Sequence, residues 1–354
     1  MPVLASLFKP PLFLRNGHLQ TILPALLHRR FPVLFRRERL ELPDGDFLDL
    51  DWATSGGDRL AILSHGLEGS SEDRCVRGMA TRLQAKGWDA LAWNFRGCGQ
   101  ESNRLLRFYH SGETGDLGAV IALAAARYSR IALIGFSLGG NVTLKYLGEG
   151  ACHPAVIAGI AVSVPIDLAT SAEAIDRRWS NRLYLRRFLK RLVPKVAAKA
   201  LLFPDRLNIS RRHQIRTLRE FDDLYTAPIH GFRDAMDYWE KSSSRQYLDR
   251  IKVPALLVNA RDDPFLTPES FPYEEAERNP NLFFEAPTWG GHVGFIDSTR
   301  NMQPWYESRA TEFLEDSNAA WADSLSRAGI LCPQSRAKHI RRQRLAPNRS
   351  QNRG

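Results

Sequence analysis

The sequence predicts an α/β fold in which a mostly parallel central sheet is flanked by helices and carries a helical cap insertion. From Phe47 onward, short apolar runs alternate with longer helix-like stretches, which is typical of strand–helix–strand units. Several runs, such as 131–134, are continuously apolar and therefore suit strands that are buried on both faces. The alternation stops at about Pro165 and resumes at Val253, and the helical, aromatic and charged composition between them indicates an inserted cap.

Six segments predict strands because each is short, apolar and bounded by polar or turn residues: 60–64, 89–94, 131–135, 156–161, 255–259 and 282–285. Helix-like patterns lie between or after them: 73–86, 115–128, 139–149, 268–278 and 304–316. The first 45 residues show no clear period, and we expect them to wrap against the core. The predicted parts are an N-terminal wrapping segment (1–45), an α/β core (46–165 and 251–318), a helical cap (166–250) and a basic, disordered C-terminal tail (319–354).

The composition is that of an ordinary globular protein. Of 354 residues, 44% are hydrophobic and 25% charged, which excludes a disordered chain, a collagen and a disulfide scaffold. The formal net charge is +10, but eight Lys and Arg and no acid fall within 327–354, which leaves +2 for the rest. Because the basic character belongs mainly to the tail, no specific nucleic-acid partner is expected. A protein that binds polyanions through the tail is the alternative from a different class of function.

The cysteines are spread along the chain without a CxxC spacing: Cys75, Cys98, Cys152 and Cys332. They are too few to staple a chain of this size, so we expect reduced thiols and a cytoplasmic location. Lys9, Pro10 and Arg15 interrupt the apolar N-terminal residues, and neither a signal peptide nor a membrane span is predicted. The sequence lacks HExxH and clustered His/Asp sets, so no metal and no organic cofactor is expected.

A candidate nucleophile lies in Gly135-Phe-Ser137-Leu-Gly139, directly after an apolar strand pattern and directly before a helical one. This is the setting of a tight strand-to-helix turn that presents a serine, and small residues are needed on either side because larger side chains would clash. A serine hydroxyl is a weak nucleophile at neutral pH, so Ser137 requires a histidine base and an orienting carboxylate, in the order Ser, Asp, His along the chain.

His292 is the candidate base, because Trp289-Gly-Gly-His-Val-Gly294 forms a loop after the last predicted strand and before the final helix. The other histidines beyond Ser137 are less well placed: His153 follows the nucleophile helix too closely, His213 and His230 fall in the cap, and His339 falls in the tail.

The candidate acid follows the strand predicted at 255–259, where Asp262 and Asp263 compete for the role. Pro264 biases the backbone of the residue before it toward an extended conformation, which favours Asp263 as the side chain aimed inward. Asp262 is then a turn or ion-pair residue.

Acyl transfer also needs two backbone N–H donors for the developing oxyanion. The expected donors are Leu138, just after the nucleophile, and Leu67, in the loop Ser64-His65-Gly66-Leu67-Glu68-Gly69 that follows an early strand. We expect His65 to order this turn rather than to act as a base.

The motifs together resemble those of the α/β-hydrolase superfamily, and specifically its YheT-like branch of esterases. The resemblance covers the chain up to about residue 318. Besides the motifs above, it rests on Asn16-Gly-His-Leu-Gln-Thr21, Asn94-Phe-Arg-Gly-Cys-Gly99, Phe221-Asp-Asp, Thr226-Ala-Pro228 and Asn259-Ala-Arg-Asp-Asp-Pro264. It implies an α/β-hydrolase fold and a charge-relay triad of Ser137, Asp263 and His292.

The function predicted from the sequence is therefore that of a serine carboxylic-ester hydrolase that acts on short- to medium-chain acyl esters through an acyl-enzyme. Relatives of this kind include alcohol acyltransferases, which use the same triad, so acyl transfer to an alcohol remains the alternative. The partner expected is a small-molecule acyl ester, and the oligomeric state is left open.

The predicted cap offers apolar and aromatic walls for an acyl chain: Trp179, Leu183, Phe188, Leu192, Tyr238 and Trp239. Within 178–196 these apolar residues are interleaved with arginines and a lysine at near-helical spacing. Such a helix can pack its apolar stripe over the acyl pocket with its arginines in solvent, which we favour, or lie on an anionic membrane as a peripheral contact.

Overall fold

The computed structural model describes residues 3–26, 31–150, 152–298 and 302–327, with no side-chain description beyond residue 317. Within these ranges, nine strands form one sheet in the order β1-β9-β8-β7-β6-β4-β5-β3-β2. The strands from β1 to β5 in this order are parallel, and β3 and β2 follow as an antiparallel edge. Their bounds are β1 (Val3–Leu4), β2 (Arg36–Glu41), β3 (Phe47–Ala53), β4 (Leu60–Ser64), β5 (Asp89–Trp93), β6 (Ile131–Phe136), β7 (Val156–Val162), β8 (Ala255–Val258) and β9 (Leu282–Glu285). The predicted fold class is confirmed.

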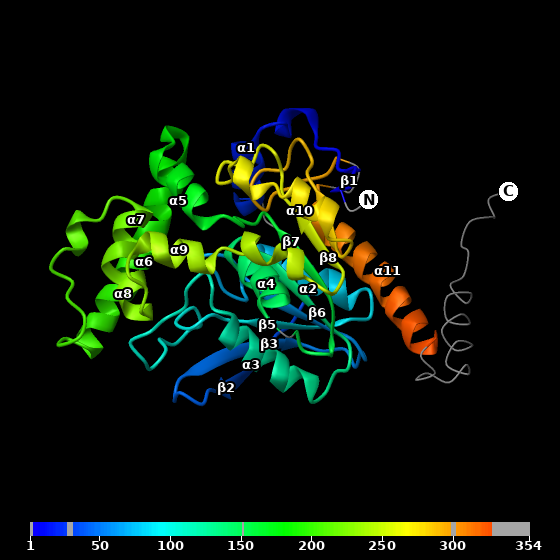
Figure 1. Cartoon of the computed structure of the whole chain (residues 1–354), viewed down its shortest axis with the longest axis horizontal. Coiled ribbons are helices and arrows are strands. Elements are labelled where there is room, and N and C mark those ends of the chain that lie inside the picture. The colour runs from blue at the N-terminus through cyan, green and yellow to red at the C-terminus, as the bar shows by residue number, and fades with distance from the viewer. Residues whose placement is uncertain (1–2, 27–30, 151, 299–301, 328–354) are drawn as a thin grey trace.

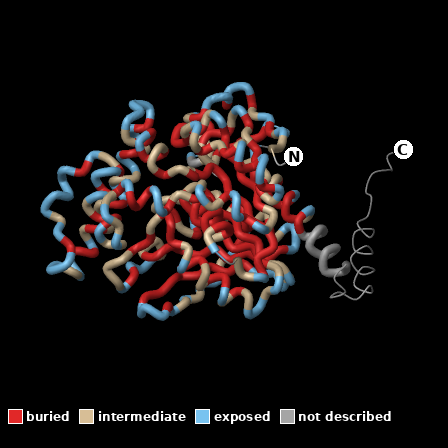
Figure 2. The backbone as a smooth tube through the Cα atoms, in the orientation of Figure 1, coloured by how far each residue is buried: buried red, intermediate tan, exposed pale blue. Residues whose placement is uncertain are grey.

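Helices cover both faces of this sheet (Figure 1). Along β4, Leu60 and Ile62 belong to the hydrophobic cluster that contains residues of α3, α4 and α10, whereas Ala61 and Leu63 belong to the cluster that contains residues of α2 and α11. The alternation follows from the two-residue repeat of a strand. The helices of the core are α1 (Gly17–Leu26), α2 (Arg74–Gln84), α3 (Thr114–Ala125), α4 (Leu138–Glu149), α10 (Tyr273–Arg278) and α11 (Trp305–Arg327). Burial is therefore densest around the sheet, as Figure 2 shows.

A helical cap follows β7 and precedes β8. Its helices are α5 (Leu168–Arg177), α6 (Arg182–Leu202), α7 (Leu218–Phe221), α8 (Ala227–His230) and α9 (Ala235–Ser242), with a π-helical turn, η4 (Asp222–Thr226), between α7 and α8. The cap has a hydrophobic cluster of its own, in which Leu192, Phe221 and Trp239 are buried, and it lies to one side of the sheet in Figure 1. Among the described residues, no helix is both long and apolar enough to cross a bilayer.

The N-terminal residues do more than wrap the core, because they supply both edge strands of the sheet. β1 is two residues long and pairs with β9, and β2 is the charged segment Arg-Arg-Glu-Arg-Leu-Glu paired with β3. Neither strand has an apolar run long enough to predict a strand from the sequence. Edge strands are often short or charged, because this hinders pairing with another chain.

Candidate active site

The structure places Ser137 at a tight turn between β6 and α4, with φ 53° and ψ −119°. The turn brings its neighbours so close that a Cβ on Gly135 would lie 2.2 Å from the Gly139 carbonyl oxygen, and a Cβ on Gly139 would lie 2.4 Å from the Ser64 oxygen. The two glycines are therefore required by close approach. A positive φ on a serine is strained and is held here by the strand before it and the helix after it.

His292 and Asp263 form a hydrogen-bonded pair, with 2.8 Å between Nδ1 of the histidine and Oδ2 of the carboxylate. The Asp263 side chain is fully buried, and its other oxygen accepts the backbone N–H of Phe265 at 2.9 Å. The Phe265 ring lies 4.4 Å from the imidazole, centroid to centroid. The acid thus fixes the Nδ1 side of the imidazole, which leaves Nε2 for exchange of a proton.

Asp262 faces a different partner. Its Oδ1 accepts the backbone N–H of Gly291 at 2.9 Å, and burial raises the pKa of its carboxyl to about 6. Asp262 therefore supports the loop that carries His292, whereas Asp263 contacts the imidazole itself.

Helix α1 holds the His292 loop from the outside. The backbone N–H of His292 donates to Thr21 Oγ1 at 2.9 Å, and the buried amide of Gln20 accepts from the Ile296 N–H and donates to the Ile296 oxygen. A Cβ on Gly17 would lie 1.8 Å from the Asp262 oxygen, so only glycine permits this contact. Sequence reasoning missed these residues, although the signal was present in Asn16-Gly-His-Leu-Gln-Thr21, a motif to which it gave no role.

The two predicted oxyanion donors line the same cavity as Ser137 and His292. Leu138 is the first residue of α4, where N–H groups have no intrahelical acceptor. In the loop after β4, the Glu68 N–H donates to the Tyr109 hydroxyl and the Gly69 N–H donates to the Gly66 oxygen, so these two donors are already used; Leu67, which precedes them, stays the predicted donor.

His65 lies beneath this loop and has a structural role. It is fully buried, and burial lowers the pKa of its imidazole to about 3, so it is neutral. Its Nε2 accepts the Phe95 N–H at 3.2 Å and its Nδ1 lies 2.7 Å from the Gly66 oxygen. The neutral imidazole thus bonds two backbone segments, as expected for a residue that orders the turn.

Cap helix α6 is bonded to the same loop through Glu68. Lys195 Nζ lies 2.5 Å from Glu68 Oε1, the Tyr109 hydroxyl donates to the same oxygen at 2.8 Å, and Arg191 donates to the Glu68 carbonyl oxygen at 2.9 Å. Glu68 has φ 54°, so these contacts hold a strained residue next to Leu67. The sequence carried no separate signal for this link, because Glu68 and Lys195 are 127 residues apart.

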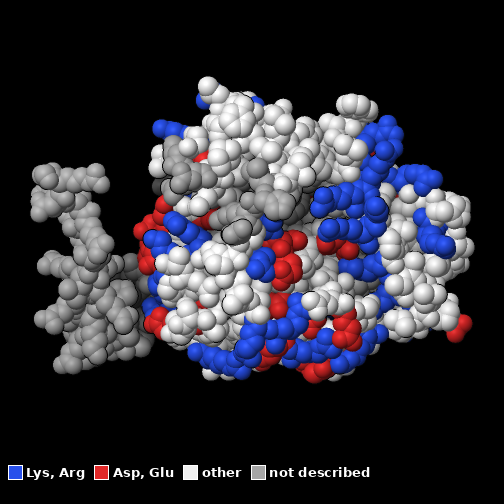
Figure 3. Space-filling model, turned by 180° about the vertical axis from the view of Figure 1, so that it is seen from behind, with Lys and Arg blue, Asp and Glu red and all other residues white. Residues whose placement is uncertain are grey.

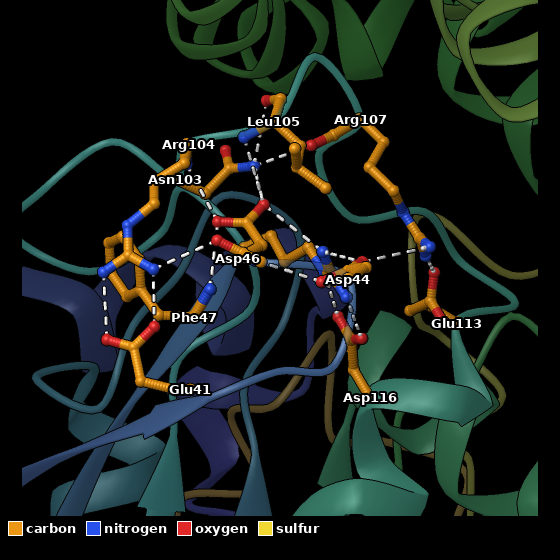
Figure 4. A network of polar contacts seen from close by, with 12 residues as sticks. Glu41, Asp44, Asp46, Phe47, Asn103, Arg104, Leu105, Arg107, Glu113 and Asp116 are labelled. Atoms are coloured by element: carbon orange, nitrogen blue, oxygen red, sulfur yellow. Dashed lines mark hydrogen bonds and ion pairs between the residues drawn. The ribbon is translucent and has the colours of Figure 1, made fainter.

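A charged network holds the loop around residues 103–107, which contacts α6 (Figure 4). Arg96 pairs with Asp116 and Asp44 at 2.7 Å, and Asp46 accepts the side-chain amide of Asn103 at 2.6 Å. Lys199 of α6 donates to the carbonyl oxygen of Asn103. Residues 108–111, which follow this loop, line the cavity beside Ser137, so the network supports one wall of the site.

The central cavity holds about 110 Å³ and lies between the sheet edge and the cap. Phe188, Leu192, Tyr238 and Trp239 line it, as predicted. The prediction was wrong for Trp179 and Leu183, whose side chains are 80% and 71% exposed on the outer side of the cap. An entrance groove of about 700 Å³ shares Leu67, Phe188 and His292 with the cavity and opens beside Arg187 and Arg191.

In the part of the chain that the structure describes, no group of three or more His, Cys, Asp or Glu is arranged to hold a metal ion. The groups that the structure brings to this cavity include the Ser137 hydroxyl and the imidazole of His292 with the carboxylate of Asp263.

Comparisons with known proteins show the family and the fold of this chain. The chain matches the family described as alpha/beta hydrolase fold over residues 62–299. It is 38% identical over 309 residues to "Putative esterase YheT" of Escherichia coli, covering 84% of this chain and 90% of that protein. It is 25% identical over 386 residues to the medium-chain fatty acid ethyl ester synthase/esterase 2 of Saccharomyces cerevisiae, covering 87% and 85% of the two chains. Among solved structures, the esterase Pf2001 of Pyrococcus furiosus shares the fold, with a TM-score of 0.58 at 22% identity over 81% of this chain and 92% of that one.

Proposed function

This chain belongs to the α/β-hydrolase fold family, and from that membership we propose that it is a serine carboxylic-ester hydrolase acting through an acyl-enzyme. The observation that carries the proposal is the 2.8 Å contact between His292 and Asp263 in a loop that lines one cavity with Ser137. A buried acid paired with an imidazole, beside a serine on a strained turn, is the arrangement that activates a hydroxyl nucleophile.

In the proposed mechanism, Ser137 Oγ attacks the ester carbonyl carbon while His292 Nε2 accepts the hydroxyl proton. The proton then passes from His292 to the departing alcohol, and an acyl-enzyme remains. A water molecule gives its proton to His292 and attacks the acyl carbon, which releases the acid. Asp263 keeps the imidazole oriented throughout, and the N–H groups of Leu67 and Leu138 bind the oxyanion in both halves of the reaction.

Short- to medium-chain acyl esters are the proposed substrates. The central cavity is small and its walls are mainly apolar, with Phe188 and Leu192 facing it from α6. Each acyl CH₂ buried there contributes about 0.8 kcal/mol, or roughly fourfold in binding. The name of the yeast relative, which specifies medium-chain ethyl esters, supports this range.

Acyl transfer to an alcohol is the second candidate, favoured by the word synthase in the name of that relative. The same triad would serve both reactions, and the outcome would depend on whether water or an alcohol reaches the acyl-enzyme through the entrance groove. Product analysis in the presence of ethanol separates the two, because transfer yields an ethyl ester.

A peripheral membrane contact is part of the proposal. Trp179 and Leu183 are exposed, and Arg182, Arg186 and Lys190 are exposed on the same helix or next to it. In Figure 3, Lys and Arg gather on the cap side of the molecule, and others lie along its lower edge among acidic residues. Exposed apolar side chains beside cationic ones suit an anionic bilayer.

The tail, which the alternative of polyanion binding would need, lies mostly outside the described residues. We also retain a cytoplasmic location, supported by the free thiols of Cys75, Cys98 and Cys152.

The proposal is tested with a fluorophosphonate probe and with p-nitrophenyl esters of increasing acyl length. Wild type should be labelled, and Ser137→Ala should lose both labelling and hydrolysis while keeping its melting temperature. We expect kcat/KM to rise from acetate to about hexanoate. Labelling of Ser137→Ala at wild-type strength would overturn the assignment of the nucleophile, and a steady fall from acetate upward would show that the cap closes the cavity to longer chains.

A further inference from the structure

Asp222 is a carboxyl in the wall of the central cavity that the proposed reaction does not use. It begins the π-helical turn η4 in the cap, whereas Ser137 comes from the sheet. Thr226 Oγ1 donates to its Oδ1 at 2.6 Å, and Trp239 Nε1 donates to its Oδ2 at 2.8 Å. Asp222 is half-buried in the cap and is among the residues that line the cavity.

The surroundings of Asp222 disfavour the ionised form of its carboxyl. Among the described residues, no Lys or Arg forms an ion pair with it, and the ionisable groups that face it are Asp176, Asp223 and Tyr238. Burial raises the pKa of the Asp222 carboxyl to about 7, against the opposing effect of its two hydrogen bonds. A buried acid without a cation lowers stability, and acids with perturbed pKa values in clefts are frequent at functional sites.

The hydrogen bonds of Asp222 leave capacity for a ligand. A carboxylate offers about four acceptor positions, and the described residues occupy two of them. A hydroxyl group can bind in either protonation state, because it donates to the carboxylate and accepts from the neutral acid. Around the carboxyl the cavity is apolar, with Leu218 and Phe221 in its wall, so the matching ligand carries one polar group on an apolar chain.

The backbone at this point is unusual as well. A π-helical turn interrupts the helical run from α7 to α8, and such turns occur frequently at functional sites. The turn places Thr226 four residues after Asp222 with its hydroxyl on the carboxyl. Asp222, Thr226 and Trp239 thus form a built polar subsite at the cap wall.

We propose that Asp222 binds a hydroxyl group carried by the acyl chain, so that the enzyme prefers hydroxyacyl esters to unsubstituted esters of the same length. This inference rests on the proposed function for its substrate, but the subsite itself is defined by Asp222, Thr226 and Trp239. A site built to bond a hydroxyl discriminates against the analogue that lacks it, because a buried polar group is then left without its partner.

The kinetic experiment compares ethyl hexanoate with ethyl 3-hydroxyhexanoate and ethyl 6-hydroxyhexanoate. In wild type, we expect at least one hydroxylated ester to have a kcat/KM about tenfold higher than the unsubstituted ester. Asp222→Leu should bring this ratio to about one, and Asp222→Asn should retain part of it. Ser171→Ala is the matched control, since Ser171 also lines the cavity and is bonded to Ser270 instead, and it should keep the wild-type ratio. Equal rates for all three esters in wild type, or a preference that survives Asp222→Leu, would overturn the proposal.

A binding experiment separates this inference from the proposed function. In the Ser137→Ala background, calorimetry should show that hexane-1,6-diol binds more tightly than hexan-1-ol, and Asp222→Leu should remove the difference. If wild type hydrolyses no ester but the diol still binds more tightly than hexan-1-ol, the esterase proposal fails and the subsite stands. If wild type hydrolyses esters but shows no preference for a hydroxyl, the subsite proposal fails and the esterase stands. If Asp222→Leu melts more than several degrees below wild type, Asp222→Asn carries both tests: the hydroxyl preference should then be reduced rather than abolished, and a preference equal to that of wild type would overturn the proposal.

Discussion

Lys195 Nζ lies 2.5 Å from Glu68 Oε1, which bonds a cap helix to the loop next to a proposed oxyanion donor. The same helix lines the cavity with Leu192 and Phe188, which lie about one and two turns before Lys195. The position of the Leu67 N–H therefore depends on how the cap is seated. Under the proposed function, α6 therefore links the contacts made with substrate in the cavity to the position of the proposed oxyanion donor.

Lys195→Met should lower kcat by about tenfold with a smaller change in KM. Removing an oxyanion donor outright costs about 10²–10³ in rate, and a displaced donor should cost less. The variant also leaves the Glu68 carboxylate buried without its cation, so the melting temperature should fall. The matched control is Lys190→Met, because Lys190 is exposed on the same helix. Equal kinetics for the two variants would contradict a role for the Glu68 contact.

The two adjacent acids should differ strongly on mutation. Asp263→Asn removes the negative charge beside His292, and an amide oxygen kept on the Phe265 N–H turns the NH₂ donor toward Nδ1, which favours the wrong tautomer of the imidazole. A loss on the order of 10⁴ in kcat is expected from the serine-protease precedent. Asp262→Asn keeps an oxygen for the Gly291 N–H and should cost less than tenfold. Steady-state kinetics on one ester decides the matter, and similar losses in both variants would mean that Asp262 shares the orienting role.

Gln20→Ala should loosen the His292 loop from a distance. The variant leaves the Ile296 N–H without its acceptor, and an unsatisfied buried donor costs about 1–3 kcal/mol. Both kcat and the free energy of unfolding should fall, as measured by kinetics and by denaturant titration. Leu19→Ala is the control, since Leu19 is 48% exposed on the same helix. Unchanged kcat in Gln20→Ala would show that Thr21 alone suffices to hold the loop.

Buried imidazoles predict that stability falls in acid. Burial lowers the pKa of His65 and His110 to about 3 and that of His230 to about 2, so between about pH 3 and 6.5 the unfolded chain binds more protons than the folded one. Unfolding free energy therefore decreases as pH falls through this window.

Asp222 has the opposite effect on the pH dependence of the free energy of unfolding, because its raised pKa makes the folded state bind the extra proton between about pH 4 and 7. Relative to wild type, Asp222→Asn should thus gain stability as pH rises from 5 to 8, measured by thermal melts; a constant difference would contradict the burial of an ionisable Asp222.

The sequence predicted the core of the fold because its strands are continuously apolar, and all six predicted strands are present. It also singled out Ser137, Asp263 and His292 as candidates, since a nucleophile turn and the loops after β8 and β9 have local signatures; of these, Asp263 and His292 are in contact, and Ser137 and His292 line one cavity. The outward orientation of Leu183 could not be predicted, because α6 has apolar residues on more than one side and its packing partner decides which face is buried. Trp179 lies in a short helical turn before α6, where no helical face could be assigned from the sequence. Contacts such as Gln20 with Ile296 and Lys195 with Glu68 join segments far apart in the chain, and no local pattern encodes them.

The pairing of β1 with β9 joins the two ends of the sheet's chain, since Val3 pairs with Phe284. During synthesis the N-terminal residues emerge first, yet their strand partner and the His292 loop that α1 holds emerge almost last. Contacts of such high sequence separation form late, because a long loop must close before they can contribute. His292, the proposed base, is therefore expected to reach its final position only after the rest of the sheet has assembled. Pulse-labelled hydrogen exchange during refolding should show the amide of His292 protected after those of β4 and β6. A nascent chain in which β9 has not yet emerged would then have the turn that carries Ser137, but His292, the proposed base, would not yet be in place. Under the proposed function, such a chain would have no esterase activity until translation is nearly complete.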